Sequence, residues 1–205
     1  MKKNINLIKG THDIYGSDME KFEFIIENFY SVCKNFNFKS ILTPIIEKQE
    51  LFSRSVGEQT DIVSKEMYSF KDKGEIDICL RPEATSSLAR FAATNYQSGL
   101  MILITHGPMF RRERPQKGRY RQFHQINIET IGEKSPYVDF ELILVAKLLF
   151  DKLGIKKSSF KLLINSLGSK EDQFNYSEKL KKYLNNYKKK LSEISILRLD
   201  KNPLR

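Results

Sequence analysis

GPMFRRERPQKGRYRQFHQINIETIG, at residues 107–132, is the stretch around which the rest of the chain is organised. Its two arms have the residue pattern of β-strands, and its middle collects Arg114, Lys117 and Arg119 around Gly118. Two strand patterns separated by a short segment that contains glycine predict a hairpin. We therefore predict an antiparallel hairpin with a basic loop, for which the other elements serve as a scaffold.

The second arm of this hairpin carries two different faces, because successive side chains of a strand point to opposite sides. One face carries Arg121, Phe123, Gln125, Asn127 and Glu129. The other face carries Gln122, His124, Ile126, Ile128 and Thr130. We expect Ile126 and Ile128 to pack inward. A cation, an aromatic ring, two amides and a carboxylate in one row are unusual for a face that only meets water, so this row is the candidate functional surface.

The first arm adds Arg111 and Glu113 beside that row, with Met109 on the same face, if the two arms pair antiparallel. Arginine offers a planar fork to phosphate or carboxylate oxygens. A phenylalanine ring such as Phe123 offers a stacking platform for a purine. The surface therefore suits a nucleotide together with a ligand that bears an ammonium group. The basic loop has two interpretations that stay open, an ordinary exposed hairpin loop or a contact with a phosphate backbone.

The elements before the hairpin follow from spacing and turn signals. A helix is predicted to begin at Ser17, with Ser17 and Glu20 forming a capping box. A strand is predicted over Lys39–Ile46. Pro44 within it has no N–H to donate, so it belongs at a sheet edge or an interface. A short helix is predicted to follow, over about Lys48–Val56.

The remaining elements are predicted by the same rules. They are a hairpin of Met67–Phe70 with Ile76–Leu80, helices over about Ser86–Tyr96, Ser135–Leu153 and Lys170–Leu191, and strands over Leu100–Ile104 and Phe160–Ile164, the latter buried. Thr85 or Glu83 is expected to cap the first of these helices, and SILRLDKNPLR at 195–205 is expected to begin as a strand. Strands joined largely by hairpins, with helices between groups, favour an α+β fold with a mainly antiparallel sheet flanked by helices.

Composition narrows the function classes less than the hairpin does. The 205 residues carry a formal net charge of +10, which suits a polyanionic partner. The excess of positive charge is mostly lysine and does not decide whether that partner is a nucleic acid. Cys33 and Cys79 match no metal-ligand spacing and favour buried thiols in a reducing compartment. No run approaches the roughly 18 apolar residues of a membrane span, and no signal peptide is predicted. We expect a cytoplasmic protein without a membrane or metal site.

Several motifs together resemble one enzyme family. FRRERPQKGRYRQFHQ at 110–125 resembles motif 2 of the class II aminoacyl-tRNA synthetases in its histidyl form. RPEAT at 81–85 resembles the histidine-binding segment of the histidyl-tRNA synthetase family, and KGTHDIYG at 9–16 resembles its N-terminal signature. The first helix and the Pro44 strand, about 17–56, resemble motif 1, and motif 2 extends over about 107–132. NSLGS at 165–169 and RLDKNPLR at 198–205 are also similar to this family, so the resemblance covers essentially the whole chain.

The resemblance implies roles for individual residues. Arg111 would be the catalytic residue that binds the α-phosphate of ATP and the amino-acid carboxylate. ATP binding is implied for Arg111, Glu113, Arg121 and Phe123, with Glu113 on the adenine amino group and Phe123 stacked on the adenine ring. Histidine binding is implied for Glu83, Ala84, Thr85, Arg111, Gln125 and Glu129. Contacts with tRNA are implied for Gln116, Lys117, Arg119 and Arg121.

The implied function is ATP-dependent ligation of L-histidine to tRNA-His through histidyl-adenylate, with Mg²⁺ accompanying ATP. A homodimer through the motif 1 helix and the Pro44 strand is also implied. Motif 3 and the anticodon-binding domain have no counterpart in residues 1–205, so we expect the N-terminal portion of a class II catalytic domain. His12, His106 and His124 are dispersed, and we expect them to be structural.

Two other interpretations stay open. One is a non-catalytic, synthetase-like regulatory subunit that binds histidine or tRNA. The other is a plain nucleic-acid-binding domain, which predicts no binding of ATP or histidine. The presence of Arg111, Glu113, Gln125 and Glu129 together favours the ligase, since a pure regulator has no need for the full set.

Overall fold

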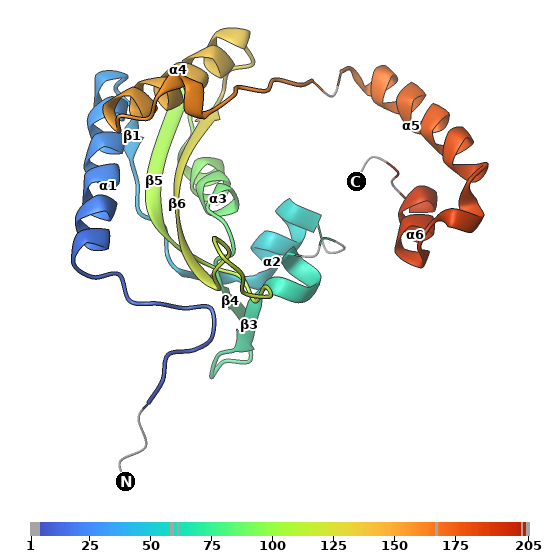
Figure 1. The fold of residues 1–205 in the computed structure, drawn as a ribbon, viewed down its shortest axis with the longest axis horizontal. Helices are drawn as coiled ribbons and strands as arrows, with labels where there is room; N and C mark the ends of the chain where they lie inside the picture. Colours follow the sequence, from blue (N-terminus) through green and yellow to red (C-terminus); the bar gives the residue numbers. More distant parts are fainter. Residues whose placement is uncertain (1–4, 58–59, 61, 167, 202, 204–205) are drawn as a thin grey trace. The chain divides into compact units, whose positions relative to one another are not determined.

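The protein is described here by a computed structural model, which covers residues 5–57, 60, 62–166, 168–201 and 203. The chain divides into two compact units, Met1–Lys156 and Lys157–Arg205. Figure 1 shows the helices and strands of both units in chain order. The predicted hairpin lies in the first unit, which is described first.

The central sheet of the first unit has three strands in the order β1-β5-β6. They are β1 (Lys39–Ser40), β5 (Met101–Phe110) and β6 (Gln122–Ile131). Strand β1 runs parallel to β5, and β5 pairs antiparallel with β6 along its whole length. The predicted antiparallel hairpin is therefore confirmed, with β5 and β6 as its two arms.

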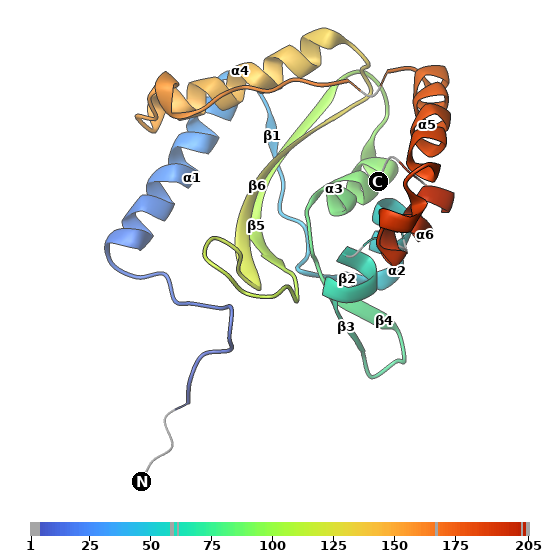
Figure 2. The same ribbon diagram turned by 45° about the vertical axis from the view of Figure 1, so that its right-hand side comes forward.

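Helices cover both faces of this sheet. On one face lie α1 (Ser17–Asn35) and α4 (Pro136–Lys152), and on the other lies α3 (Thr85–Asn95) (Figures 1 and 2). The predicted α4 is confirmed, and the Ser135 hydroxyl accepts a hydrogen bond from the amide of Tyr137 at its first turn. The sheet is thus enclosed between two helical layers, as the α+β prediction requires.

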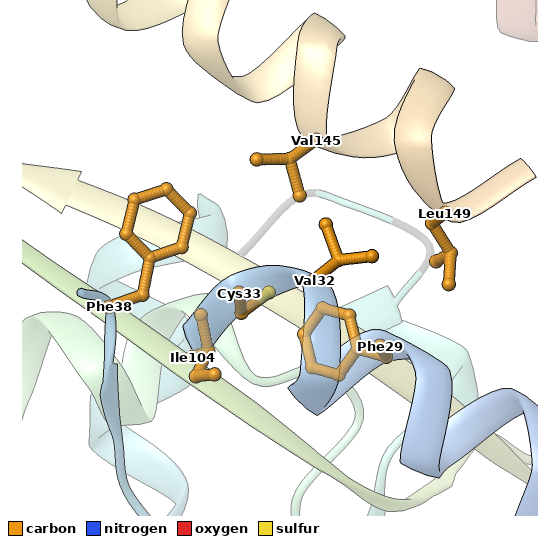
Figure 3. Close-up of a cluster of buried hydrophobic side chains, with 7 residues drawn as sticks. All are labelled: Phe29, Val32, Cys33, Phe38, Ile104, Val145 and Leu149. Carbon is orange, nitrogen blue, oxygen red and sulfur yellow. The ribbon is translucent and has the colours of Figure 1, made fainter. Parts of the chain in front are cut away.

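The main hydrophobic core fills the space between the sheet and the α1–α4 layer (Figure 3). Its buried residues are Phe29, Val32, Cys33, Phe38, Ile104, Val145 and Leu149. Ile128 of β6 packs against this cluster from the edge. The apolar stripe of α1 therefore meets the apolar face of the hairpin, and burial of both holds the sheet in place.

A second, smaller sheet has the order β2-β4-β3 and is antiparallel throughout. Its strands are β2 (Ile46–Lys48), β3 (Tyr68–Lys71) and β4 (Asp77–Leu80), which confirms the predicted hairpin around Asp72. Helix α2 (Gln49–Phe52) continues into a π-helical turn at Ser53–Gly57, and a second such turn follows at Ile62–Glu66. Phe52, Met67 and Cys79 form a separate core cluster beneath them.

The prediction of one continuous strand before β2 is wrong. The strand expected over Lys39–Ile46 is split into β1 and β2, and Pro44 lies in neither. The Ile41 amide still donates to Ile104 of β5, whereas the Ile45 carbonyl accepts from the amide of Arg81, so the chain crosses from one sheet to the other between them. Pro44 lacks the N–H that would continue either ladder.

The start of α1 also differs from the prediction, although the helix itself is confirmed. Its N-cap is Gly16, with φ of 59°, and no side chain caps it. The Gly16 carbonyl accepts from the amides of Met19 and Glu20 instead. The expected capping box of Ser17 and Glu20 is therefore wrong, because Ser17 already lies inside the first turn.

The second unit contains α5 (Lys170–Asn185), a 3-10 turn at Lys188–Lys190 and α6 (Glu193–Lys201). Ser169 and Asp172 form a capping box at the start of α5. The predicted strand at the start of 195–205 is wrong, since α6 spans it and the Ser192 hydroxyl accepts from the Ser195 amide in its first turn. Residues 202, 204 and 205 of that stretch lie outside the described residues.

The buried strand predicted over Phe160–Ile164 is also wrong. These residues form no strand in the described part of the chain, and Leu163 and Ile164 are 78% and 75% exposed. A strand needs a neighbour for its backbone N–H and C=O groups, and no described strand pairs with this segment. None of the helices in the described ranges is both long enough and apolar enough to cross a membrane.

Candidate active site

The pairing of β5 with β6 brings the predicted polar row onto one face of the sheet. Met109 lies opposite Phe123, Gly107 opposite Gln125, and Thr105 opposite Asn127. Residues directly opposite in an antiparallel pair share a face, so this face, which meets α3, also carries part of β5. Beyond the strand ends, the Arg111 amide donates to the Arg121 carbonyl at 2.9 Å and continues the same pattern.

Arg111 is held in one orientation by its surroundings. Its Nε donates to the carbonyl of Pro82 at 2.9 Å, and its guanidinium carbon lies 5.1 Å from the centroid of the Phe123 ring. Its Nη1 lies 4.0 Å from Oε1 of Glu113. A planar cation stacked on a ring and fixed at Nε presents the rest of its fork to an anionic ligand. The structure therefore brings Arg111, Glu113 and Phe123 together as the sequence predicted.

Glu113 anchors the beginning of the basic loop. Its side chain is only 10% exposed, and its Oε2 lies 2.5 Å from Nε of Arg119. Arg121 Nε donates to the Glu113 carbonyl at 3.3 Å. The loop closes with reciprocal backbone hydrogen bonds between Gln116 and Arg119. Two of the four residues implied in tRNA contacts, Arg119 and Arg121, are thus tied to the polar face.

The other two residues implied in tRNA contacts lie at the loop tip, where Gln116 and Lys117 are exposed. Gly118 follows them with φ of 78°, a left-handed conformation that favours glycine. The side chains of Gln116 and Lys117 make no hydrogen bond or ion pair found among the described residues, so they are available to a partner. Both interpretations of the loop, an ordinary exposed loop and a contact with a phosphate backbone, are compatible with this geometry.

The N-terminal segment 9–16 packs against the same hairpin. The Gly10 carbonyl accepts from the Arg121 amide at 2.7 Å. A Cβ at Gly10, where φ is 89°, would lie 2.8 Å from Cγ of Pro115 and 2.9 Å from Cγ of Arg121. The rings of His12 and Tyr120 also meet, with centroids 4.5 Å apart. Glycine is required here both for its conformation and for the close approach of the hairpin.

A second cluster forms where the start of α3 meets β6. The Thr85 hydroxyl donates to Oε1 of Glu129 at 2.5 Å, and Oε1 of Glu83 accepts from the amide of Ser86 at 3.0 Å. Ala84 is fully buried between them in sequence. The prediction that Thr85 or Glu83 is the N-cap is wrong, because Ala84 occupies that position and Thr85 is already the first residue of α3. Two carboxylates and a hydroxyl at one place suit a ligand ammonium group.

Several buried polar atoms on this face have no hydrogen-bond partner among the described residues. They are Oγ1 of Thr105, Oε1 of Gln125 and Oδ1 of Asn127. A buried acceptor without a partner is costly, and such groups concentrate where a ligand or water completes the set. Thr105 was not predicted, because the next residues on its face of β5, Leu103 and Gly107, have no polar side chain, and only the register with Asn127 identifies it.

The opposite face of the hairpin is structural. The Tyr30 hydroxyl and Nδ1 of His106 are 2.8 Å apart, and the rings of Phe22 and His124 meet with centroids 4.8 Å apart. His124 thus lies away from the polar row, as predicted. Ile128 packs inward as expected, but the expectation for Ile126 is wrong, since it is 38% exposed. Helix α1 covers only part of this face (Figure 2).

Comparison with known proteins identifies the family. The profile described as Histidyl-tRNA synthetase matches residues 10–196. The chain belongs to the histidyl-tRNA synthetase family. A curated relative from Hydrogenovibrio crunogenus named Histidine--tRNA ligase is 44% identical over 207 residues, which is 100% of this chain and 48% of the relative. The chain therefore spans about half the length of this relative.

Solved structures agree on the fold. The apo histidyl-tRNA synthetase of S. aureus superposes with a TM-score of 0.77 and 32% identity, over 98% of this chain and 47% of that chain. A structure described as an ATP phosphoribosyltransferase regulatory subunit/histidyl-tRNA synthetase from Bacillus halodurans has a TM-score of 0.66 at 20% identity, over 97% of this chain and 56% of that chain. The second likeness shows the fold alone. The predicted family and the predicted α+β, class II synthetase-like core are confirmed.

Membership of a synthetase family implies ATP, and typically Mg²⁺ with it. The described residues contain no group of three or more histidine, cysteine, aspartate or glutamate side chains that could hold a metal ion. These residues therefore build no protein-only cage for Mg²⁺. Mg²⁺ in nucleotide sites takes many of its ligands from phosphates and water.

Proposed function

We propose that this chain is the N-terminal part of the catalytic domain of a histidine–tRNA ligase. Motif 1 then occupies about residues 17–56 and motif 2 about residues 107–132. Motif 3 and the anticodon-binding domain would come from sequence outside residues 1–205. The relative of about twice this length supports that division. The observation that carries the proposal is the arrangement of Arg111, held by the Pro82 carbonyl and stacked on Phe123 beside Glu113.

The ATP site is proposed at the end of the polar row that adjoins the basic loop. Arg111 binds the α-phosphate, Phe123 stacks on adenine, and Glu113 accepts from the adenine amino group. The low exposure of the Glu113 side chain and its contact with Arg119 support a fixed carboxylate at that point. Arg121 reaches the phosphates from the other side of the loop. Mg²⁺ accompanies the nucleotide.

The histidine site is proposed beside it, where α3 meets β6. Glu83, Ala84 and Thr85 hold the α-amino group, and Gln125 and Glu129 bind the rest of the amino acid. The Thr85–Glu129 hydrogen bond and the unpartnered oxygen of Gln125 support a polar pocket here. The guanidinium of Arg111 lies over Phe123, and its Nε donates to the carbonyl of Pro82, the residue before Glu83. One guanidinium can therefore hold both the histidine carboxylate and the α-phosphate.

The proposed reaction is an in-line attack of the histidine carboxylate on the α-phosphorus of ATP. The bond from the α-phosphorus to the bridging oxygen breaks, and pyrophosphate leaves with its electron pair. Arg111 stabilises the charge that develops, so positioning and electrostatics carry the rate. A hydroxyl of the terminal ribose of tRNA-His then attacks the histidyl carbonyl, an ester forms, the bond to the phosphate breaks, and AMP leaves. Gln116, Lys117, Arg119 and Arg121 contact the tRNA from the loop.

A homodimer is proposed through α1 and the link that contains Pro44. Exposed apolar side chains on both elements support it, since Phe24 and Ile25 of α1 and Leu42 of the link are 50%, 39% and 78% exposed. Sedimentation equilibrium of the full-length protein tests this point. A cytoplasmic location is proposed from the two free, buried cysteines, which suit a reducing compartment.

The regulatory-subunit alternative is not favoured. The relative at 44% identity is named a histidine–tRNA ligase, whereas the structure with a regulatory name is only 20% identical. The test is histidine-dependent exchange of pyrophosphate with ATP by the full-length protein. A regulatory subunit would bind histidine and give no exchange.

The role of Arg111 is tested by Arg111→Ala in that assay. We expect exchange to fall by about 100- to 1,000-fold, because a donor to transition-state charge is lost. Arg112→Ala is the matched control. Its side chain is exposed, its amide donates to Glu66, and we expect exchange within about twofold of wild type. Exchange unchanged by Arg111→Ala would overturn the assigned role.

A further inference from the structure

Arg81 is a buried cation that no part of the proposed reaction uses. It is 3% exposed and lies directly after β4, before the start of α3. Its Nε donates to the Pro108 carbonyl at 3.0 Å, and its Nη1 donates to both the carbonyl and the hydroxyl of Thr43 at 2.9 Å. Burying a guanidinium is costly unless its donors find acceptors, so these bonds fix its position closely.

The main chain of Arg81 binds the same two segments as its side chain. Its amide donates to the Ile45 carbonyl at 2.9 Å, and its carbonyl accepts from the Phe110 amide at 3.0 Å. One residue therefore joins the link between β1 and β2, the end of β4 and the end of β5. These are the segments of motif 1, the RPEAT stretch and motif 2.

The space for this guanidinium depends on Gly107. A Cβ built at Gly107 would lie 2.3 Å from Nη2 of Arg81, and its backbone conformation is one that other residues can adopt. Glycine is thus needed at this position for room and not for conformation. The nearby carboxylate of Glu47, itself mostly buried, offsets part of the cost of burying the charge.

The next residue, Pro82, connects Arg81 to the proposed chemistry. The Pro82 carbonyl accepts the Nε–H of Arg111. Pro82 directly follows Arg81, whose amide, carbonyl and side chain all make hydrogen bonds. We propose that Arg81 is a positioning residue for Arg111. By holding the Pro82 carbonyl against the end of β5, it fixes the guanidinium that binds the α-phosphate. This inference rests on the function proposed above for Arg111.

A merely structural Arg81 would act on stability alone, so the test needs a readout at Arg111. We choose Arg81→Met in the full-length protein, which keeps the length of the stem and removes the donors. The control is Arg90→Met, because Arg90 binds the same Glu47 carboxylate at 2.8 Å and touches neither Pro108 nor Thr43 in any bond found in the structure. Both variants are compared with wild type in the folded state.

Two measurements are made on each variant. In histidine-dependent pyrophosphate exchange, we expect Arg81→Met to lower kcat by about 100-fold with a smaller change in KM, since the misplaced group acts in the transition state. In the ligand-free protein, we expect the Nε–H resonance of Arg111 to lose its protection from solvent exchange. Arg90→Met should change neither result. Wild-type kcat and a protected Arg111 Nε–H in Arg81→Met would overturn the inference.

Gly107→Ala provides a second route if Arg81→Met does not fold. The added methyl group displaces Nη2, and we expect about a 10-fold loss of kcat. The same substitution should cause no further loss in a background that lacks this nitrogen, which is Arg81→Met or, if that variant does not fold, Arg81→Lys. An equal loss in both backgrounds would mean that the methyl group blocks the site directly, and the inference would fail.

The failure of this inference can be told apart from failure of the proposed function. If wild type shows no histidine-dependent exchange, the proposed function fails, and the resonance of Arg111 alone decides whether Arg81 positions it. If exchange is present and only the effect of Arg81 is missing, the proposed function stands and the inference fails.

Discussion

The two faces of β6 differ in what they contact, although their residues alternate along one strand. On one face, Phe123 stacks with Arg111 and Glu129 accepts from Thr85. On the other face, Ile128 joins the core formed with α1 and α4. A strand can thus carry binding chemistry and structural packing at once, because its period of two separates them. Substitutions at neighbouring positions of β6 should therefore affect different properties, ligand binding on one face and stability on the other.

The polar face is the less favourable one for stability. Gln125 and Asn127 each keep a buried oxygen without a partner in the described residues, whereas the opposite face meets closely packed side chains. A face optimised only for folding would replace these amides with apolar groups. Functional sites commonly contain buried polar groups without partners, and the stability lost there is offset by packing in the rest of the fold.

The largest expected effect lies on the core side of this comparison. Phe29→Ala should lower the free energy of unfolding by about 3–5 kcal/mol, because Phe29 is 1% exposed within the main cluster. Phe140→Ala is the matched control, since Phe140 is 61% exposed on α4 and should cost less than about 1 kcal/mol. Denaturant unfolding measures both. Equal losses would contradict the placement of the core.

A smaller effect is expected on the polar face. Glu129→Gln keeps the shape of the side chain and an oxygen for the Thr85 hydroxyl, but removes the negative charge. We expect histidine affinity to fall by about 10- to 100-fold, with stability nearly unchanged. Calorimetric titration of the full-length protein with histidine measures the first quantity. Thr130→Val, one position along on the other face, should leave histidine affinity intact, and a comparable loss there would break the comparison.

The smallest expected effect concerns the exclusion of water from the main hydrophobic core. The ionisation of the buried Cys33 thiol measures this exclusion. Burial raises the pKa of Cys33 to about 11, from an ordinary value of 9.0. The thiol therefore keeps its proton in the folded protein at a pH where the unfolded chain has lost it. Its contribution to stability is complete below pH 9 and is lost as pH rises towards 11.

The change at Cys33 amounts to on the order of 2 kcal/mol over that pH range. The measurement is denaturant unfolding at several pH values for wild type and Cys33→Val. Valine cannot ionise, so its curve should fall less steeply between pH 9 and 11. Identical slopes would show that the sulfur is not in a dry environment.

Local patterns predicted much of this structure. Strand alternation and the basic loop predicted the hairpin and the face that carries Arg111, Phe123 and Glu129. Serine and proline at the start of α4 gave its first turn. These features depend on residues close in sequence, so they can be found without a fold. The individual site roles came from family resemblance and stay predictions.

The errors and omissions share a different cause. Pro44 lies where the chain changes sheets, and Arg81 binds segments up to 38 residues away in sequence. Thr105 is identified only by its partner on β6. Ile126 has a core pattern but is 38% exposed on β6, which forms one edge of the sheet. Each depends on where distant segments meet, which periodicity cannot show.

The central claim is that the polar face of the β5–β6 hairpin binds the nucleotide and the other face does not. The most direct measurement is methyl NMR of the full-length protein, with labels on Met109, directly opposite Phe123, and on Ile126 of the other face. On addition of ATP and histidine, we expect the Met109 methyl resonance to shift and that of Ile126 to stay in place. A shift at Ile126 without one at Met109 would contradict the account.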